Sequence, residues 1–167
     1  IPMNRLPELA LAVALIVAGT IIVATIGLLP PIVPSHFGFD GRPDRWSPRD
    51  AYVAIMLALA LGLPLLIVAS TATLRGIPTR WINLPHRDYW LAPERREHTY
   101  RTLRAFACSV GALVALFIAG LHVVVITGAL TRGGASPNAP FLALLGLFLA
   151  GIAIMLAWLA RRFARPG

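Results

Sequence analysis

Four long, uncharged apolar runs restrict what this sequence can fold into. They cover residues 9–29, 51–74, 105–130 and 139–160, and none of them contains Asp, Glu, Lys or Arg. A helix needs about 20 apolar residues to cross the hydrocarbon core of a bilayer. The chain is 57% hydrophobic and only 13% charged, and a soluble fold of 167 residues could not bury so much apolar surface. The runs therefore predict four membrane-spanning helices.

The fold class follows from the same runs. Lipid offers the backbone no hydrogen-bond partner, so only helices and closed barrels cross it, and these runs are too long and too unalternating for barrel strands. We expect an all-α, integral membrane four-helix bundle that forms a single membrane domain over residues 1–167. Ser47 and Pro48 have the residue types that begin a helix, and Pro64 should kink the second span. The expected segments are spans at about 7–29, 51–74, 105–130 and 139–160, an outer hairpin at 30–50 and an inner amphipathic loop at 75–104.

The placement of arginine predicts the orientation. All fifteen basic residues are Arg, and they flank the spans instead of forming a stripe suited to nucleic acid. Eleven would lie on one side of the membrane, namely Arg5, the seven within 75–104, and the three within 161–165, and four on the other, within 42–49 and at Arg132. Positively charged loops remain in the cytoplasm. We therefore expect a multi-pass protein of a bacterial cytoplasmic (inner) membrane, with both termini and the inner loop inside.

The outer hairpin is the first candidate site. Its prolines stiffen the chain, and Asp40-Gly41 is a turn signal. One interpretation is a rigid, membrane-hugging cap with internal Asp–Arg pairs. The other is a small polar site for a partner or ligand, in which His36 and Asp44 are weak metal candidates because their spacing matches no strong metal signature. The candidate residues are His36, Phe37, Asp40, Asp44, Arg45 and Trp46.

His122 is the intramembrane polar residue of the third span. At about 1.5 Å per residue from Arg104, it lies in the outer leaflet. Its ring could hydrogen-bond a neighbouring helix or the outer loop, or it could approach His36 and join a polar cluster under the hairpin. A further alternative is ligation of haem or another pigment in a larger assembly. The sequence predicts no cofactor otherwise.

The inner loop combines aromatic and basic residues. This combination favours the membrane interface and anionic lipid headgroups, and a docking surface for a cytoplasmic partner is the alternative. Pro93 could open a helix that continues into the third span, and Glu97 and Arg101 have the spacing of a helical ion pair. The expected interfacial anchors are Trp81, Tyr89, Trp90, Arg95 and Arg96.

Small residues recur at four-residue intervals in the third and fourth spans. Such rows let two helix backbones approach closely. They could form contacts inside the bundle or contacts to a partner subunit. The residues are Gly111, Ala115 and Ala119 in the third span, and Gly146 and Ala150 in the fourth.

Two blocks of the sequence resemble a known family. The first block includes Leu29-Pro30, Pro34, His36-Phe37, Gly41, Pro43-Asp44 and Trp46, and the second includes Asn83-Leu84-Pro85 and the run from Asp88 to Arg96. Together they resemble a small, four-helix bacterial membrane-protein family catalogued as a domain of unknown function. Its module also occurs in larger SdpI-type toxin-immunity and signalling membrane proteins. His86 stands where the family pattern leads us to expect Asn. The resemblance implies a membrane fold, and implies no reaction, substrate or cofactor.

The motifs favour a binding role over catalysis. The sequence has no nucleophile elbow, P-loop, dinucleotide fingerprint or HExxH motif, and no carboxylate or arginine lies in mid-membrane, where a proton relay would need one. We expect a non-enzymatic accessory or binding protein, a small subunit that docks to a larger membrane complex. The alternative is a sensor or immunity-type receptor for an extracytoplasmic peptide or metal.

Overall fold

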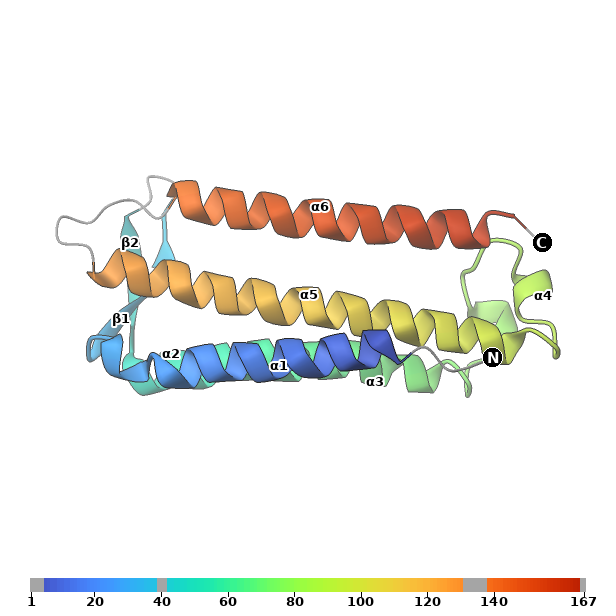
Figure 1. The fold of residues 1–167 in the computed structure, drawn as a ribbon, viewed down its shortest axis with the longest axis horizontal. Helices are drawn as coiled ribbons and strands as arrows, with labels where there is room; N and C mark the ends of the chain where they lie inside the picture. The colour runs from blue at the N-terminus through green and yellow to red at the C-terminus, as the bar shows by residue number, and fades with distance from the viewer. Residues whose placement is uncertain (1–4, 39–41, 131–137, 166–167) are drawn as a thin grey trace.

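Four long helical segments run side by side in the computed structural model, which describes residues 5–38, 42–130 and 138–165 (Figure 1). They are α1 (Leu6–Ala24), the consecutive elements α2 (Arg49–Leu57), η2 (Ala58–Gly62) and α3 (Leu63–Thr73), α5 (Arg96–Leu130) and α6 (Asn138–Phe163). Each segment is long and apolar enough to cross a membrane. The predicted helical, four-span membrane fold is confirmed. Helix α5 begins at Arg96, in the inner loop, and continues into the third span, as the position of Pro93 led us to expect.

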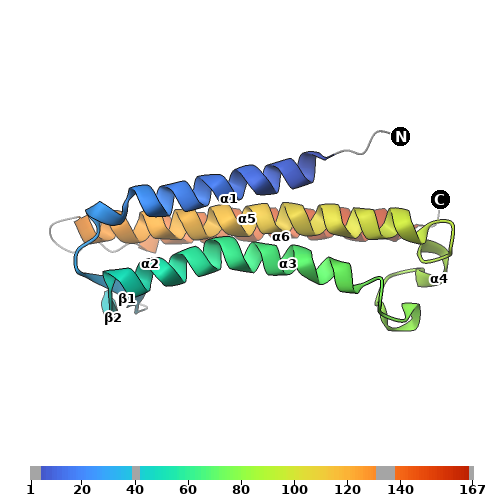
Figure 2. The ribbon, with the colours of Figure 1, turned by 90° about the horizontal axis from the view of Figure 1, so that it is seen from below.

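Helix α5 forms the centre of the bundle. Helices α1 and α3 lie beside it on one side, and α6 lies on the other (Figures 1 and 2). The core between α1, the second span and α5 contains five fully or nearly fully buried alanines, which bring the backbones close together. These alanines are Ala14, Ala18, Ala60, Ala115 and Ala119.

Gly111 marks the tightest contact between these three segments. A Cβ atom added at Gly111 would lie 3.2 Å from Leu11 Cδ1 and 3.4 Å from both the Cβ and the carbonyl oxygen of Pro64. The predicted small-residue row of α5 therefore packs inside the bundle. It packs against α1 and α3 at once.

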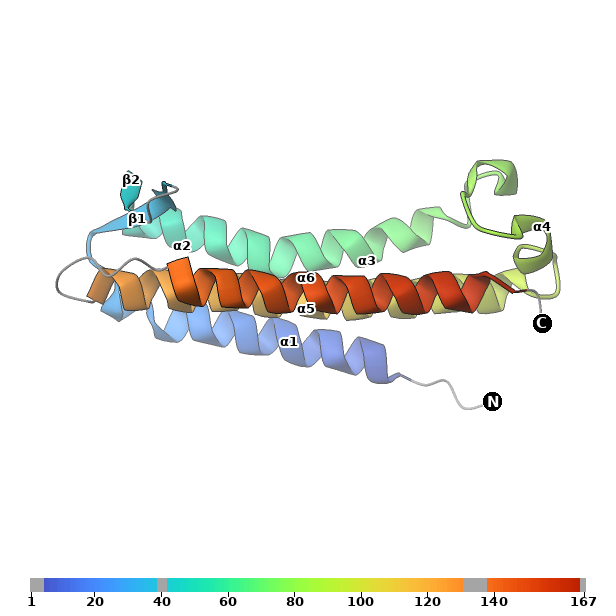
Figure 3. The ribbon, with the colours of Figure 1, turned by 90° about the horizontal axis from the view of Figure 1, so that it is seen from above.

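The second span bends in the middle, at the junction of α2 and α3 (Figure 3). Pro64 has no amide hydrogen, so it cannot complete the regular helical hydrogen bonding of the turn before it. The turn before it, η2, is π-helical, which is one of the recognised causes of a helix kink. The kink predicted from Pro64 is confirmed.

A two-stranded antiparallel ladder closes one end of the bundle, which we call the hairpin end. Strand β1 (Ile32–Phe37) follows a short turn, η1 (Ile26–Leu28), and pairs with β2 (Pro43–Pro48). Val33 is fully buried in the helical core and anchors the ladder. Ser47, predicted to cap the second span, instead lies in β2 and donates a hydrogen bond to Ser35 Oγ at 2.9 Å. Helix α2 begins at Arg49 after Pro48 without a side-chain cap.

The inner loop folds back on the opposite end, where both termini lie (Figure 1). It contains η3 (Thr79–Trp81) and α4 (Arg87–Trp90). Trp90 was predicted as an interfacial anchor, and the structure contradicts this. The residue is only 6% exposed, its ring packs edge-on against Phe163, and its Nε1–H donates to the Phe163 carbonyl at 3.1 Å. A carbonyl at the end of a helix has no partner within that helix, and Trp90 supplies one to α6. Trp81, by contrast, is 73% exposed, as an interfacial anchor would be.

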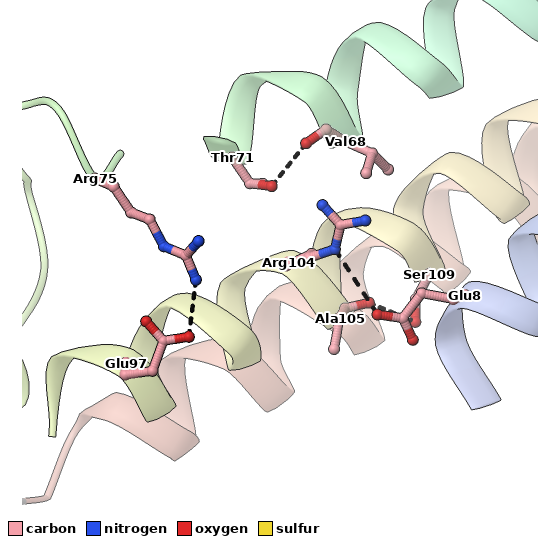
Figure 4. Close-up of polar contacts among 8 residues, drawn as sticks. All are labelled: Glu8, Val68, Thr71, Arg75, Glu97, Arg104, Ala105 and Ser109. Carbon is pink, nitrogen blue, oxygen red and sulfur yellow. Dashed lines mark hydrogen bonds and ion pairs between the residues drawn. The ribbon is translucent and has the colours of Figure 1, made fainter. Parts of the chain in front are cut away.

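His86 and Glu97 complete the contacts of this end. His86 adopts a left-handed conformation (φ 51°, ψ 40°), and its ring nitrogen Nε2 lies 3.1 Å from the Ala164 carbonyl oxygen. Asn adopts this conformation more readily than most residues, which gives a physical reason for Asn at this position. Glu97 pairs with Arg75 at 2.8 Å instead of Arg101, because the end of the second span lies directly beside α5 (Figure 4).

Helix α6 packs on α5 through one face. A Cβ atom at Gly120 would lie 2.8 Å from Leu144 Cδ1, one at Gly151 would lie 2.9 Å from Leu113 Cδ2, and Phe117 stacks on Phe148. The predicted row of Gly146 and Ala150 does not take part. Both residues are exposed, and a Cβ atom at Gly146 would meet nothing within 4 Å. Of the two alternatives that the sequence left open for this row, contacts inside the bundle do not apply, because the α5-facing small residue of α6 is Gly151.

These contacts predict that two glycine substitutions affect stability to different extents. Gly111→Leu should lower the free energy of unfolding by about 1–3 kcal/mol, because the new side chain overpacks the contact with α1 and α3. Gly146→Leu should change it by less than about 0.5 kcal/mol, because its side chain enters open space. Unfolding by SDS titration in mixed micelles measures both. Equal losses of stability would contradict the packing described here.

Candidate functional site

A cleft lies beneath the β-hairpin, between α2, α5 and the first turn of α6. Its volume is about 440 Å³, which falls in the range of small-molecule sites. Polar groups from β1 line one part, and the rest of the wall is apolar except for Tyr52 and Asn138. The lining residues are Ser35, His36, Phe37, Gly38, Tyr52, Met56, Leu121, Val124, Val125, Asn138 and Phe141.

His36 and Asp44 form a hydrogen-bonded pair at the mouth of this cleft. His36 Nδ1 lies 2.5 Å from Asp44 Oδ1, and the two side chains come from opposite strands of the ladder. The register partner of His36 in the ladder is Arg45, not Asp44. The ladder is irregular on both sides of His36, and this irregularity brings the Asp44 carboxylate within hydrogen-bonding distance of the imidazole. Both side chains are more than half exposed. A carboxylate that accepts the Nδ1–H fixes the orientation of the imidazole and leaves Nε2 to face another group.

A second polar group lies behind the cleft wall and is fully buried. His122 of α5 is 0% exposed. Its Nε2 lies 2.9 Å from Thr25 Oγ1, and its Nδ1 lies 3.1 Å from the hydroxyl of Tyr52, whose ring stacks beside the imidazole. One of the sequence-based alternatives, a hydrogen bond from His122 to a neighbouring helix, is therefore confirmed. The ring joins three segments, because Tyr52 belongs to α2 and Thr25 follows α1.

The hydrogen-bond directions along this chain can be assigned. The Thr25 hydroxyl donates to the Ile21 carbonyl at 2.6 Å, so it accepts a hydrogen bond from His122 Nε2–H. A neutral imidazole with its proton on Nε2 has a lone pair on Nδ1, which accepts from the Tyr52 hydroxyl. This series of hydrogen bonds thus runs from the Tyr52 hydroxyl at the cleft wall to a backbone carbonyl of α1. The series ends at this carbonyl, which has no proton to donate. The hydrogen bonds therefore stabilise the contact between the three segments.

His122 does not fit the haem or pigment alternative. An axial ligand must offer a free nitrogen lone pair to the iron. Both ring nitrogens of His122 are engaged by hydroxyl groups, and the ring is fully buried within the protein. Binding a haem would require the loss of at least one of these hydrogen bonds and an opening of the bundle.

The structure brings together only part of the predicted hairpin site. His36, Phe37 and Asp44 line the cleft or its mouth, whereas Arg45 and Trp46 lie on the hairpin outside the cleft wall. Asp40 lies outside the described residues. Within the described parts of the chain, no three His, Cys, Asp or Glu side chains gather closely enough to hold a metal ion.

Sequence reasoning missed Tyr52 as a member of the site. Its only signal was a single phenol in the first turn of an otherwise apolar span, and that signal alone does not distinguish a headgroup contact from an internal hydrogen bond. Thr25 was expected to bond a carbonyl of its own helix. It does so, and its second role as the acceptor for His122 depends on a residue 97 positions away.

The hydrogen bonds of His122 predict that Thr25→Val destabilises the protein. Loss of the hydroxyl leaves a buried N–H without an acceptor, which should lower the free energy of unfolding by about 1–3 kcal/mol. Thr71→Val is the matched control, because that hydroxyl donates to Val68 of its own helix (Figure 4). In a His122→Leu background the Thr25→Val change should cost much less. Equal costs in the two backgrounds, measured by SDS titration, would contradict the assigned hydrogen bond.

Comparison with known proteins shows that part of this chain is similar to a sequence family. A family described as a domain of unknown function, DUF1648, matches residues 12–68. The match covers most of α1, the whole hairpin and the second span up to Val68, and therefore includes His36, Asp44, Tyr52 and Thr25. No curated protein and no solved structure matches the chain. The chain is thus a multi-pass membrane protein whose first two spans are similar to a family without an assigned function.

Proposed function

We propose that this protein is a non-enzymatic accessory subunit that docks, through α6, to a helix of a larger complex in a bacterial cytoplasmic membrane. The carrying observation is a continuous stripe of small residues on the exposed face of α6. We call it the α6 seam. It comprises seven exposed residues, Ala139, Ala143, Gly146, Ala150, Ala153, Ala157 and Ala160.

The spacing of the α6 seam is that of a helix–helix contact. Its members alternate by four and three residues over the whole helix. This seven-residue repeat keeps one seam facing a partner helix when two helices cross at about 20°. At about 100° per residue, the seam lies opposite the face formed by Leu144, Phe148 and Met155, which is turned toward α5. Figure 3 looks onto this uncovered side of α6.

Small residues favour association in lipid for a specific reason. Apolar surface gains nothing by leaving lipid, so helix pairing depends on close packing of backbones. The chain uses this principle internally at Gly111, Gly120 and Gly151, where neighbouring atoms approach the backbone closely. A second helix against the α6 seam would use the same principle externally.

The opposite end of the bundle supports the proposed orientation. The charged residues of the inner loop lie with both termini, and Arg80 and Arg95 lie over the rings of Trp81 and Tyr89. Arginine on aromatic rings at a membrane boundary suits anionic headgroups of a cytoplasmic leaflet. In the proposed orientation this end is cytoplasmic and the hairpin is extracytoplasmic.

Variants of the α6 seam should lose association with the partner without losing folding stability. In mild detergent, wild-type protein should migrate as a larger assembly, and Gly146→Leu or Ala150→Leu should release it as a monomer with an unchanged free energy of unfolding. Ala12→Leu is the matched control, because it enlarges an exposed alanine on α1. Size-exclusion chromatography with light scattering measures the mass. A monodisperse wild-type monomer without a co-purifying protein would contradict the docking role.

The cleft favours a second candidate function, a sensor or immunity-type receptor for an extracytoplasmic peptide or metal. The supporting observation is the exposed His36–Asp44 pair at the cleft mouth. A His36→Ala, Asp44→Ala double variant should then lose the ligand response while it still inserts in the membrane. A normal response from this variant would exclude the receptor function.

A further inference from the structure

The cleft beneath the hairpin has two adjoining lobes that differ in the residues each one adds to a shared wall. An inner lobe of about 440 Å³ reaches Tyr52, Met56 and three residues of α5. An outer lobe of about 430 Å³ adds Asp44 and Leu142. The lobes share five wall residues, His36, Phe37, Gly38, Asn138 and Phe141.

The part of the inner lobe that the helices line lies at membrane depth and is mostly apolar. Met56 belongs to the second span, Val124 to the third and Phe141 to the fourth, and all three lie within segments apolar enough to cross the bilayer. A hydrocarbon chain in this lobe would contact methyl, thioether and phenyl groups. A polar or charged group placed against these three side chains would lose its hydration without compensation.

The outer lobe presents hydrogen-bond acceptors. His36 donates its Nδ1–H to Asp44 Oδ1, so a neutral ring offers the Nε2 lone pair, and the second oxygen of Asp44 remains an acceptor. The negative charge of Asp44 and the two hydrogen-bond acceptors favour a cationic group with N–H donors. Arg45 is the register partner of His36, so the same short hairpin holds a positive charge outside the cleft wall, which would attract a lipid phosphate.

We propose that this two-lobed cleft binds one phospholipid with a primary ammonium headgroup, taken from the leaflet on the hairpin side. One acyl chain occupies the inner lobe, and the ammonium group donates hydrogen bonds to Asp44 and His36. The proposal does not depend on the docking role of α6, because the α6 seam lies on the face of that helix turned away from α5.

Headgroup selectivity tests the proposal with the unmodified protein. Phosphatidylethanolamine and phosphatidylcholine with identical acyl chains carry the same net charge, but only the former has N–H donors. Native mass spectrometry of the purified full chain in an equimolar mixture should show one retained lipid, with phosphatidylethanolamine favoured about tenfold, the ratio that one charge-assisted hydrogen bond supplies. Equal retention of the two lipids, or retention of neither, would overturn the proposal.

Two substitutions assign the selectivity to the two lobes. Asp44→Asn should abolish the preference for phosphatidylethanolamine, whereas Asp50→Asn should keep it, because Asp50 is a highly exposed carboxylate at the same end of the bundle. Val124→Trp should fill the inner lobe and reduce retention of both lipids, and SDS titration identifies any general loss of folding. A tenfold preference that survives Asp44→Asn would place the lipid elsewhere and overturn the proposal.

Discussion

Hydrocarbon supplies no hydrogen-bond partner, and this constraint determines both the helices and their polar contacts. The backbone satisfies it within four helical segments. Side-chain hydroxyls inside the spans satisfy it by returning to their own helix, as Thr71 and Ser109 do (Figure 4). An imidazole cannot do this with both nitrogens. His122 therefore needs Tyr52 and Thr25, and the hydrogen bonds join α5 to the segments on either side of the hairpin.

The spans and the bend could be predicted from the sequence because their causes are local. A run of about 20 apolar residues requires a helix in lipid, and Pro64 disrupts the helix that contains it. The β-ladder was predicted only as a stiff hairpin, since neither strand shows a regular alternation of apolar and polar side chains in the sequence. Pairing of His36 with Asp44 depends on ladder irregularities that no local pattern indicates.

Contacts between distant segments were the least predictable. An indole among arginines has the composition of a lipid anchor, yet Trp90 is buried because the end of α6 offers it Phe163 and an unpaired carbonyl. Small residues occur on both sides of α6, and only the structure shows that Gly151 faces α5 while Gly146 does not. The regular spacing of the α6 seam is present in the sequence, but its residues stand out as one surface only once their exposure is known.

The central claim is that the α6 seam contacts another membrane helix. A photo-crosslinking scan with a benzophenone amino acid at successive positions from 142 to 157, in native membranes, tests it most directly. We expect discrete protein adducts at Ala143, Gly146, Ala150, Ala153 and Ala157, and lipid adducts at flanking positions such as Leu147 and Ile154. Lipid adducts alone at all positions, or protein adducts without the alternation of three and four residues, would contradict the account.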